Sequence, residues 1–165
     1  MNIDYSKPLN EEFIRNNKDE IDWSYISTNQ KLSENFIREF QNKVRWDYIS
    51  EYQILSENFI REFQDKVNWI YISWHQKLSE KFIQEFQDEV NWVYISRYQK
   101  LSIKFIIEFE NKINWRNLLL NYGYYMRYTD NLYYIESNNN YCSDDLSLSE
   151  FKKLALRLIS LKVFQ

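Results

Sequence analysis

The chain has 165 residues, enough for one domain with its own core or for a short array of repeats. Hydrophobic residues make up 44% and aromatic residues 19%, which excludes a disordered chain because so much apolar side chain can be buried. The net charge of -3, from 24 acidic and 21 basic residues, gives no broad positive field for a phosphate backbone, so we expect no nucleic-acid partner.

Cysteine content and hydropathy limit the cellular compartments that the protein could occupy. The single cysteine, Cys142, excludes a disulfide within the chain and suits a reducing compartment. The amino-terminal segment lacks the apolar core of a secretory signal, and no run of 18 apolar residues is present. We therefore expect an intracellular protein with no membrane partner.

Most of the chain is a tandem repeat of 23 residues. Copy three reads ILSENFIREFQDKVNWIYISWHQ. The five copies occupy residues 8–30, 31–53, 54–76, 77–99 and 100–122. All copies keep an apolar frame that includes Trp23, Trp46, Trp69, Trp92 and Trp115. A unit this short cannot bury its own aromatic side chains, so neighbouring copies must pack on one another.

Each copy contains two predicted helix starts. In copy three, Ser56 and Asn68 each follow an apolar residue and precede a run with helical spacing, as N-cap residues do. The first cap position holds Asn10, Ser33, Ser56, Ser79 and Ser102. The second holds Asp22, Arg45, Asn68, Asn91 and Asn114, of which only Arg45 is not a capping residue. The sequence predicts an all-α fold of two-helix repeats, an α-solenoid, over residues 1–122.

Two other architectures were weighed against helix pairs. A continuous helix is excluded because a period of 23 keeps no single apolar seam. A leucine-rich type of repeat stays open as the alternative, since its period range includes 23 and the segment VRWDYI alternates like a strand. Against it, the asparagine ladder of such repeats is absent.

The fifth copy and residues 123–165 are predicted to form an end cap. In its first helix Ile103 replaces the glutamate of the three preceding copies, and Ile107 replaces an arginine or glutamine. These positions share one helix face, so we expect the rest of the chain to cover them. Gly123 should end the last repeat helix.

Three further elements are expected inside the cap. Residues 124–137 suggest a small hairpin with its turn at residues 129–131, and residues 137–145 a polar loop. Ser147 or Ser149 should begin a final helix.

No catalytic, cofactor or metal site is predicted. His75 occupies a position filled by Asn or Tyr in the other copies, and Cys142 has no second cysteine to complete a zinc site. A single glycine excludes a phosphate-binding loop. Glu34, Glu39, Glu57 and Glu62 are expected on solvated faces. We therefore expect a protein that is not an enzyme, with a carboxylate-only hydrolase as the remaining enzymatic alternative.

A partner surface is predicted where residues vary on the constant frame. One pair of positions on the second helix, four residues apart, varies most among the copies. Copy three places Ile70 and Trp74 there, between charged neighbours, as in an interface hot spot with a polar rim. We call six of these residues the variable stripe: Asp47, Glu51, Ile70, Trp74, Val93 and Arg97. Drift on a free surface, or local burial, is the alternative explanation.

The signature L-S-E-x-F-I-x-E-F followed by V-N-W-x-Y-I-S covers residues 8–122 and resembles tandem-repeat proteins encoded by large DNA viruses of amoebae. The resemblance implies a helical array in the host cytoplasm or the virion. Together with the stripe, it suggests a scaffold that binds a host or viral protein. A self-associating structural component is the second hypothesis. RNA binding ranks last, because acidic and basic residues mix along the stripe.

Overall fold

The computed structural model describes residues 3–5, 7–129, 132–137, 140–141 and 147–163. It divides into two compact units, residues 1–78 and 79–165, so the boundary between them lies inside the repeat array. Each predicted copy forms two short helices, which confirms the helical-repeat class. The strand-plus-helix alternative is wrong, because most of VRWDYI is helical from Trp46 onward.

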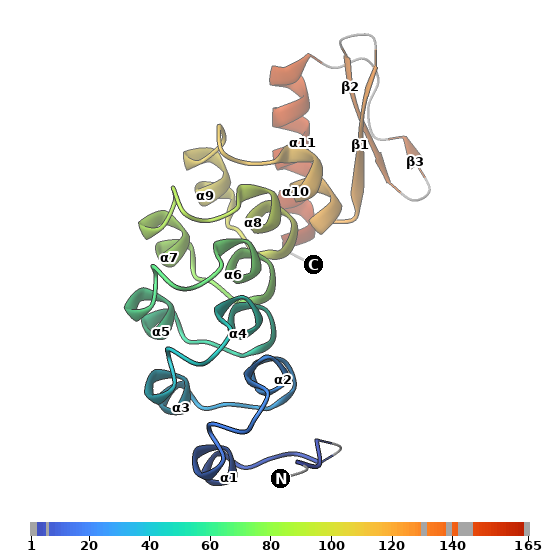
Figure 1. The fold of residues 1–165 in the computed structure, drawn as a ribbon. Coiled ribbons are helices and arrows are strands. Elements are labelled where there is room, and N and C mark those ends of the chain that lie inside the picture. The colour runs from blue at the N-terminus through green and yellow to red at the C-terminus, as the bar shows by residue number, and fades with distance from the viewer. Residues whose placement is uncertain (1–2, 6, 130–131, 138–139, 142–146, 164–165) are drawn as a thin grey trace. The chain divides into compact units, whose positions relative to one another are not determined.

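The first unit holds three helix pairs. They are α1 (Glu11–Asn16), α2 (Trp23–Asn29), α3 (Glu34–Glu39), α4 (Trp46–Tyr52), α5 (Glu57–Glu62) and α6 (Trp69–His75). Within this unit the odd-numbered helices form one row and the even-numbered helices another (Figure 1). In the second row α2 packs on α4 and α4 on α6.

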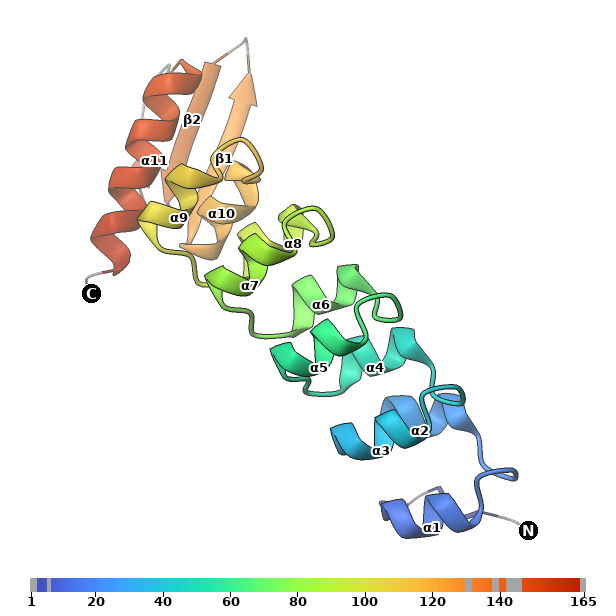
Figure 2. The ribbon, with the colours of Figure 1, turned by 90° about the vertical axis from the view of Figure 1, so that its left-hand side faces the viewer.

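The second unit holds two helix pairs and the carboxyl-terminal segment. Its helices and strands are α7 (Glu80–Glu85), α8 (Trp92–Tyr98), α9 (Ile103–Glu108), α10 (Trp115–Asn121), β1 (Tyr124–Thr129), β2 (Leu132–Ser137), β3 (Asn140–Tyr141) and α11 (Leu148–Val163). Here α8 packs on α10, and α11 contacts α9, α10 and β2 (Figures 1 and 2).

Side-chain caps begin nearly every repeat helix, as predicted. The hydroxyl of Ser56, for example, accepts the Phe59 N–H at 3.2 Å, and the side chain of Asn68 accepts two amides of the following turn. At Arg45 no side-chain cap forms. Helices of six or seven residues are not stable alone, so these caps and the packing between copies must hold them.

The core of each unit is built by contacts between consecutive copies. Phe36, Phe59, Ile49 and Ile72 are fully buried. The Trp46 ring is half-buried and lies 4.9 Å from the Phe63 ring of the next copy. Its indole N–H donates to the Gln41 carbonyl at 3.0 Å, so the one polar atom of the tryptophan is satisfied.

Buried glutamines connect each copy to the one before it. The Gln53 amide nitrogen donates to the carbonyls of Ser27 at 3.0 Å and Gln30 at 2.8 Å, and its oxygen accepts the Leu32 N–H at 3.0 Å. Gln76 makes the equivalent three bonds one copy later. The connections between copies therefore keep their backbone groups satisfied inside the protein.

Buried serines connect each copy to the one after it. The Ser50 hydroxyl donates to the Trp46 carbonyl at 2.7 Å and accepts the Asn68 N–H at 2.9 Å. Ser27 makes the same pair of bonds with Trp23 and Arg45. The hydroxyl thus fixes the start of the next second helix, including the one that Arg45 does not cap.

The carboxyl-terminal segment forms a hairpin and a helix. β1 pairs antiparallel with β2 from Tyr124↔Ser137 to Thr129↔Leu132, and β3 pairs with β2. Gly123 follows α10 with φ of 79°, the conformation predicted for the residue that ends the last repeat helix. The middle of the predicted turn, residues 130–131, and Cys142 lie outside the described residues.

Ser147 begins α11 with a reciprocal cap. Its hydroxyl lies 3.4 Å from the Glu150 N–H, and the Glu150 carboxylate accepts the Ser147 N–H at 3.1 Å. This is a capping box, in which each residue satisfies the other's backbone donor. Of the two predicted starts, Ser147 is therefore the correct one.

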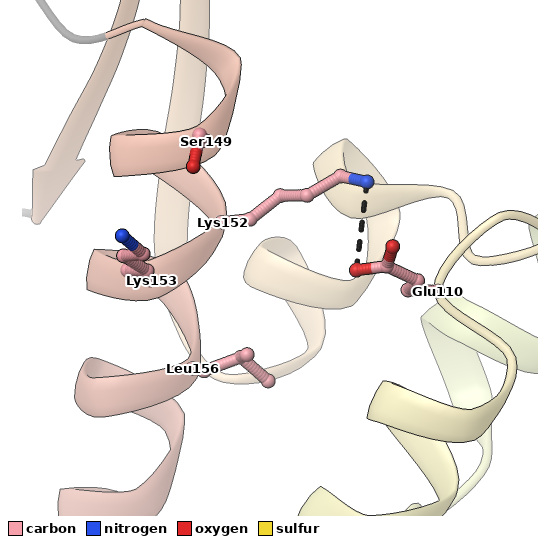
Figure 3. A pocket seen from close by; sticks show the side chains of 5 residues that line it. All are labelled: Glu110, Ser149, Lys152, Lys153 and Leu156. Carbon is pink, nitrogen blue, oxygen red and sulfur yellow. Dashed lines mark ion pairs between the residues drawn. The ribbon is translucent and has the colours of Figure 1, made fainter.

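The cap packs on the fifth copy, but it leaves part of the predicted face exposed, because Ile103 is half-buried whereas Ile107 is not. Phe151 is fully buried and its ring meets Trp115 edge to face at 6.2 Å. Lys152 pairs with Glu110 at 3.6 Å (Figure 3). Ile107, however, stays 54% exposed, so the prediction that the chain covers this position is wrong.

In earlier copies, the charged residues at the positions of Ile103 and Ile107 bind the neighbouring copy. The Glu34 carboxylate accepts the Ser56 N–H at 2.7 Å, and Arg38 donates to Glu62 at 2.8 Å. Both residues therefore bind the following copy, and the predicted solvated face is in part a set of contacts between copies. The fifth copy has no following copy for such charges to bind, which explains why Ile103 and Ile107 are apolar at these positions.

Candidate protein-interaction surface

Four residues of the variable stripe lie in the first unit, on two helices that pack side by side. Asp47 and Glu51 lie on α4, and Ile70 and Trp74 on α6. Ile70 is 48% exposed and Trp74 38% exposed. Asp47 accepts a hydrogen bond from the Asn68 side chain at 2.8 Å, which joins the acidic pair to the start of α6. The structure therefore brings an apolar pair and an acidic pair together.

The other two stripe residues lie on α8 in the second unit. Val93 is 44% exposed, and Arg97 is half-buried. The Arg97 guanidinium lies 5.8 Å from the centre of the Tyr98 ring, a cation–π distance. Tyr98 in turn stacks with Tyr94 at 6.2 Å. This part of the stripe is aromatic and basic, whereas the α4 part is acidic.

Trp74 is held by an aromatic neighbour. Its ring stacks on His75, with centroids 4.5 Å apart and planes 24° apart. The same position holds Thr28, Glu51 and Arg97 in three other copies, so the frame does not require an aromatic side chain there. A partly exposed, stacked tryptophan is a preformed anchor for a partner, because little side-chain freedom is lost when it binds.

Sequence analysis missed a second apolar group beside the stripe. The rings of Tyr48 and Tyr52 lie 6.3 Å apart along α4, tilted by 54°, and the two residues are 36% and 51% exposed. Ile54, just after the helix, is 91% exposed. The signal for Ile54 was present in the repeat, since Lys31, Lys77 and Lys100 occupy the same position of other copies. The tyrosines gave no such signal, because every inner copy has an aromatic residue at the position of Tyr48.

Charge and hydrogen bonding near the stripe involve Tyr52. Its hydroxyl bonds to the Glu51 carboxylate, and this bond, followed by desolvation and by the negative charge of Glu51, raises the pKa of Tyr52 above its ordinary value. Tyr52 is therefore a neutral donor at physiological pH, and Glu51 is held against it.

One hollow lies in the second unit, between α11 and the turn after α9. Its volume is about 480 Å³, and it is lined by Glu110, Ser149, Lys152, Lys153 and Leu156 (Figure 3). Lys152 spans it, reaching Glu110 and lying 5.7 Å from the centre of the Trp115 ring. These contacts hold the cap to the last repeat, so the hollow is part of the interface between the cap and that repeat.

Little in the described residues points to chemistry. His75 contacts the rings of Trp74 and Tyr71. Over the described ranges no three His, Cys, Asp or Glu side chains gather in a way that could hold a metal ion. None of the helices in those ranges is long and apolar enough to cross a membrane.

The stripe has to be interpreted from its own residues. When the chain is compared with known proteins, it matches no family model, no curated protein and no solved structure.

Proposed function

We propose that this protein is a non-enzymatic scaffold that binds another protein, of the host or of a virus, through the variable stripe. One observation carries the proposal: Ile70 and Trp74 are exposed together on α6, at positions where the first two copies have only polar or charged residues. Exposed apolar side chains lower solubility and do not help the frame fold. Their presence is explained if a partner buries them.

The neighbouring charges support the same role. Asp47 and Glu51 lie on the adjacent helix α4 and would form a polar rim beside the apolar pair. Rim charges steer association and discriminate between partners more than they add affinity. A partner with a basic border around an apolar pocket fits this arrangement.

Self-association through the same residues is the second candidate function. It is favoured by the same exposed pair, since an apolar patch can be buried against a second copy of the chain as well as against a different protein. Light scattering of the purified protein separates the two, because only self-association raises the mass with concentration.

The experiment is a charge substitution at the centre of the stripe. Trp74→Glu should abolish partner binding or dimerisation without unfolding the protein, because glutamate occupies the same position naturally at Glu51. Thr28→Glu places the same charge at the same position of copy one and is the matched control. A photo-crosslinker at position 74, but not at position 28, should capture the partner. If oligomeric state and captured partners are the same in both variants, the stripe is not the binding site.

A further inference from the structure

Two adjacent hollows lie in the first unit at the carboxyl ends of α2, α4 and α6. One has a volume of about 360 Å³ and includes Lys31 in its wall. The other has a volume of about 380 Å³ and includes His75 and Lys77. Tyr52, Gln53 and Ile54 line both hollows, so they form a wall between them, which we call the 52–54 ridge.

The ridge is apolar at its surface and fixed at its base. Tyr52 is 51% and Ile54 91% exposed, whereas Gln53 between them is buried and makes three hydrogen bonds to the backbone of two copies. A backbone held in this way presents the exposed side chains without further ordering, which lowers the entropic cost of binding.

Basic residues flank the ridge on both sides. Lys31 and Lys77 are exposed, and within the described part of the chain neither pairs with a carboxylate. Lys43, by contrast, is paired with Asp19 at 2.6 Å. The one carboxylate of the two hollows, Glu51, accepts the Tyr52 hydroxyl. An apolar centre with unpaired cations on either side is therefore complementary to a ligand that is apolar and acidic.

We propose that the 52–54 ridge and its two hollows bind an extended acidic segment of a partner protein. One apolar side chain enters each hollow, and carboxylates of the segment meet Lys31 and Lys77. Packed helices lie about 8–10 Å apart, and three residues of an extended polyproline II chain advance about 9 Å. Side chains three residues apart on the segment thus meet consecutive copies.

This inference rests on the proposed protein-binding role, but its ridge residues differ from the stripe pair Ile70 and Trp74. The two surfaces adjoin, because Glu51 of the stripe and His75, which stacks on Trp74, line the second hollow. Two substitutions distinguish the failure of one from the failure of the other. Ile54→Lys removes the apolar ridge and leaves the stripe intact. Trp74→Glu changes the stripe and leaves Lys31, Ile54 and Lys77 in place.

The test uses the full chain and fluorescence anisotropy with labelled 12-residue peptides. Each peptide carries two leucines three residues apart, and its remaining positions are acidic in one series, neutral amides in a second and basic in a third. The acidic series should bind, more weakly as salt is raised. Comparable affinity for all three series, or binding of none, would overturn the proposal.

Three variants sharpen the test. Ile54→Lys should weaken the acidic peptides even though it adds a cation, because both hollows lose the apolar side chain of their shared wall. It should fold normally because lysine occupies this position in three other copies. Lys77→Glu should weaken the acidic series and favour the basic one. Lys81→Glu, an exposed charge reversal on α7, is the control and should change neither. If Ile54→Lys and Lys81→Glu bind alike, the ridge is not the site, whatever Trp74→Glu does to the partner of the stripe.

Discussion

The inner copies and the fifth copy share one apolar frame but differ in the contacts they make with neighbouring copies. In an inner copy, Ser50 and Glu34 are examples of residues that bind the following copy, and Gln53 binds the preceding one. The fifth copy has Leu119 at the serine position and Ile103 at the glutamate position, so the residues that serve a following copy are gone.

The contacts to the preceding copy persist in the fifth copy. Tyr122 replaces the glutamine and donates to the Leu101 carbonyl at 3.2 Å, while the Asn121 amide takes over the bonds to the Ser96 and Gln99 carbonyls, at 3.4 and 2.9 Å. Trp115, which would stack on the next copy, packs on Phe151 of the cap instead. The array is therefore directional: the fifth copy keeps contacts to the preceding copy and lacks the serine and glutamate that point forward. Within the described residues it also leaves the buried Trp115 indole N–H without the partner that the other repeat tryptophans have.

The largest effect is expected from breaking a contact that points backward. Gln53→Leu leaves two carbonyls and one N–H without partners in a buried position, and should lower the free energy of unfolding by about 3 kcal/mol or more. Gln30→Leu, in the first copy, loses the side-chain bond from the Leu9 N–H and should cost about 1 kcal/mol. Urea denaturation of both variants measures the difference. Equal losses would contradict the directional assignment.

A smaller effect is expected at the forward contact. Ser50→Ala orphans the Asn68 N–H and should cost about 1–3 kcal/mol in the same measurement. The reverse change in the last copy, Leu119→Ser, should destabilise as well, because Leu119 is fully buried and no second helix of a sixth copy donates an N–H to the hydroxyl. A stabilising Leu119→Ser would show that the serine is not there for the following copy.

Substitutions of the exposed residues Arg38 and Ile107 should change the free energy of unfolding least. Arg38→Ile removes a partly exposed pair with Glu62 and should cost about 0–1 kcal/mol, decreasing with salt. Ile107→Arg should change stability by less than about 0.5 kcal/mol, because the side chain is exposed and has no glutamate of a next copy to meet. A large loss of stability in Ile107→Arg would indicate that the cap covers Ile107.

The cap gives a pH-dependent prediction that the repeats do not. Hydrogen bonds from the hydroxyl and then the N–H of Ser147 hold the pKa of Glu150 below its ordinary value. The stabilisation is present above the unfolded pKa and is lost as pH falls through the folded one. The protection of amides in the first turn of α11, measured relative to their intrinsic exchange rates, should therefore decrease in acid, and Glu150→Gln should remove that dependence. The same pH profile in both proteins would show that the capping box is not its cause.

Local signals in the sequence predicted the repeat helices well. Caps such as Ser56 and Asn68 depend on residues within one turn, so a single copy contains all the information needed. Gln53 and Ser50 were missed for the opposite reason. Their partners lie 18 to 26 residues away, and identity among near-duplicate copies does not distinguish a requirement from recent duplication.

The surface could be predicted only in part. The exposure of Ile70, Trp74 and Val93 agrees with their placement on the variable stripe, and whether the stripe binds a partner stays a prediction. Ile107 was assigned wrongly because an apolar residue at a formerly charged position can mean either a new cover or a lost charge partner. Only the positions of the neighbouring copies separate these cases.

The paired forward and backward contacts have a consequence for how the chain finds its register while folding. Copies two to four offer nearly the same glutamine, serine and aromatic contacts, so a copy can dock on a neighbour one place too far along the chain and still satisfy most of its bonds. The fifth copy breaks this degeneracy, because it has neither the serine nor the glutamate that would bind a successor. A chain lengthened by one more inner copy would close with the same cap, at the cost of one more way to misalign.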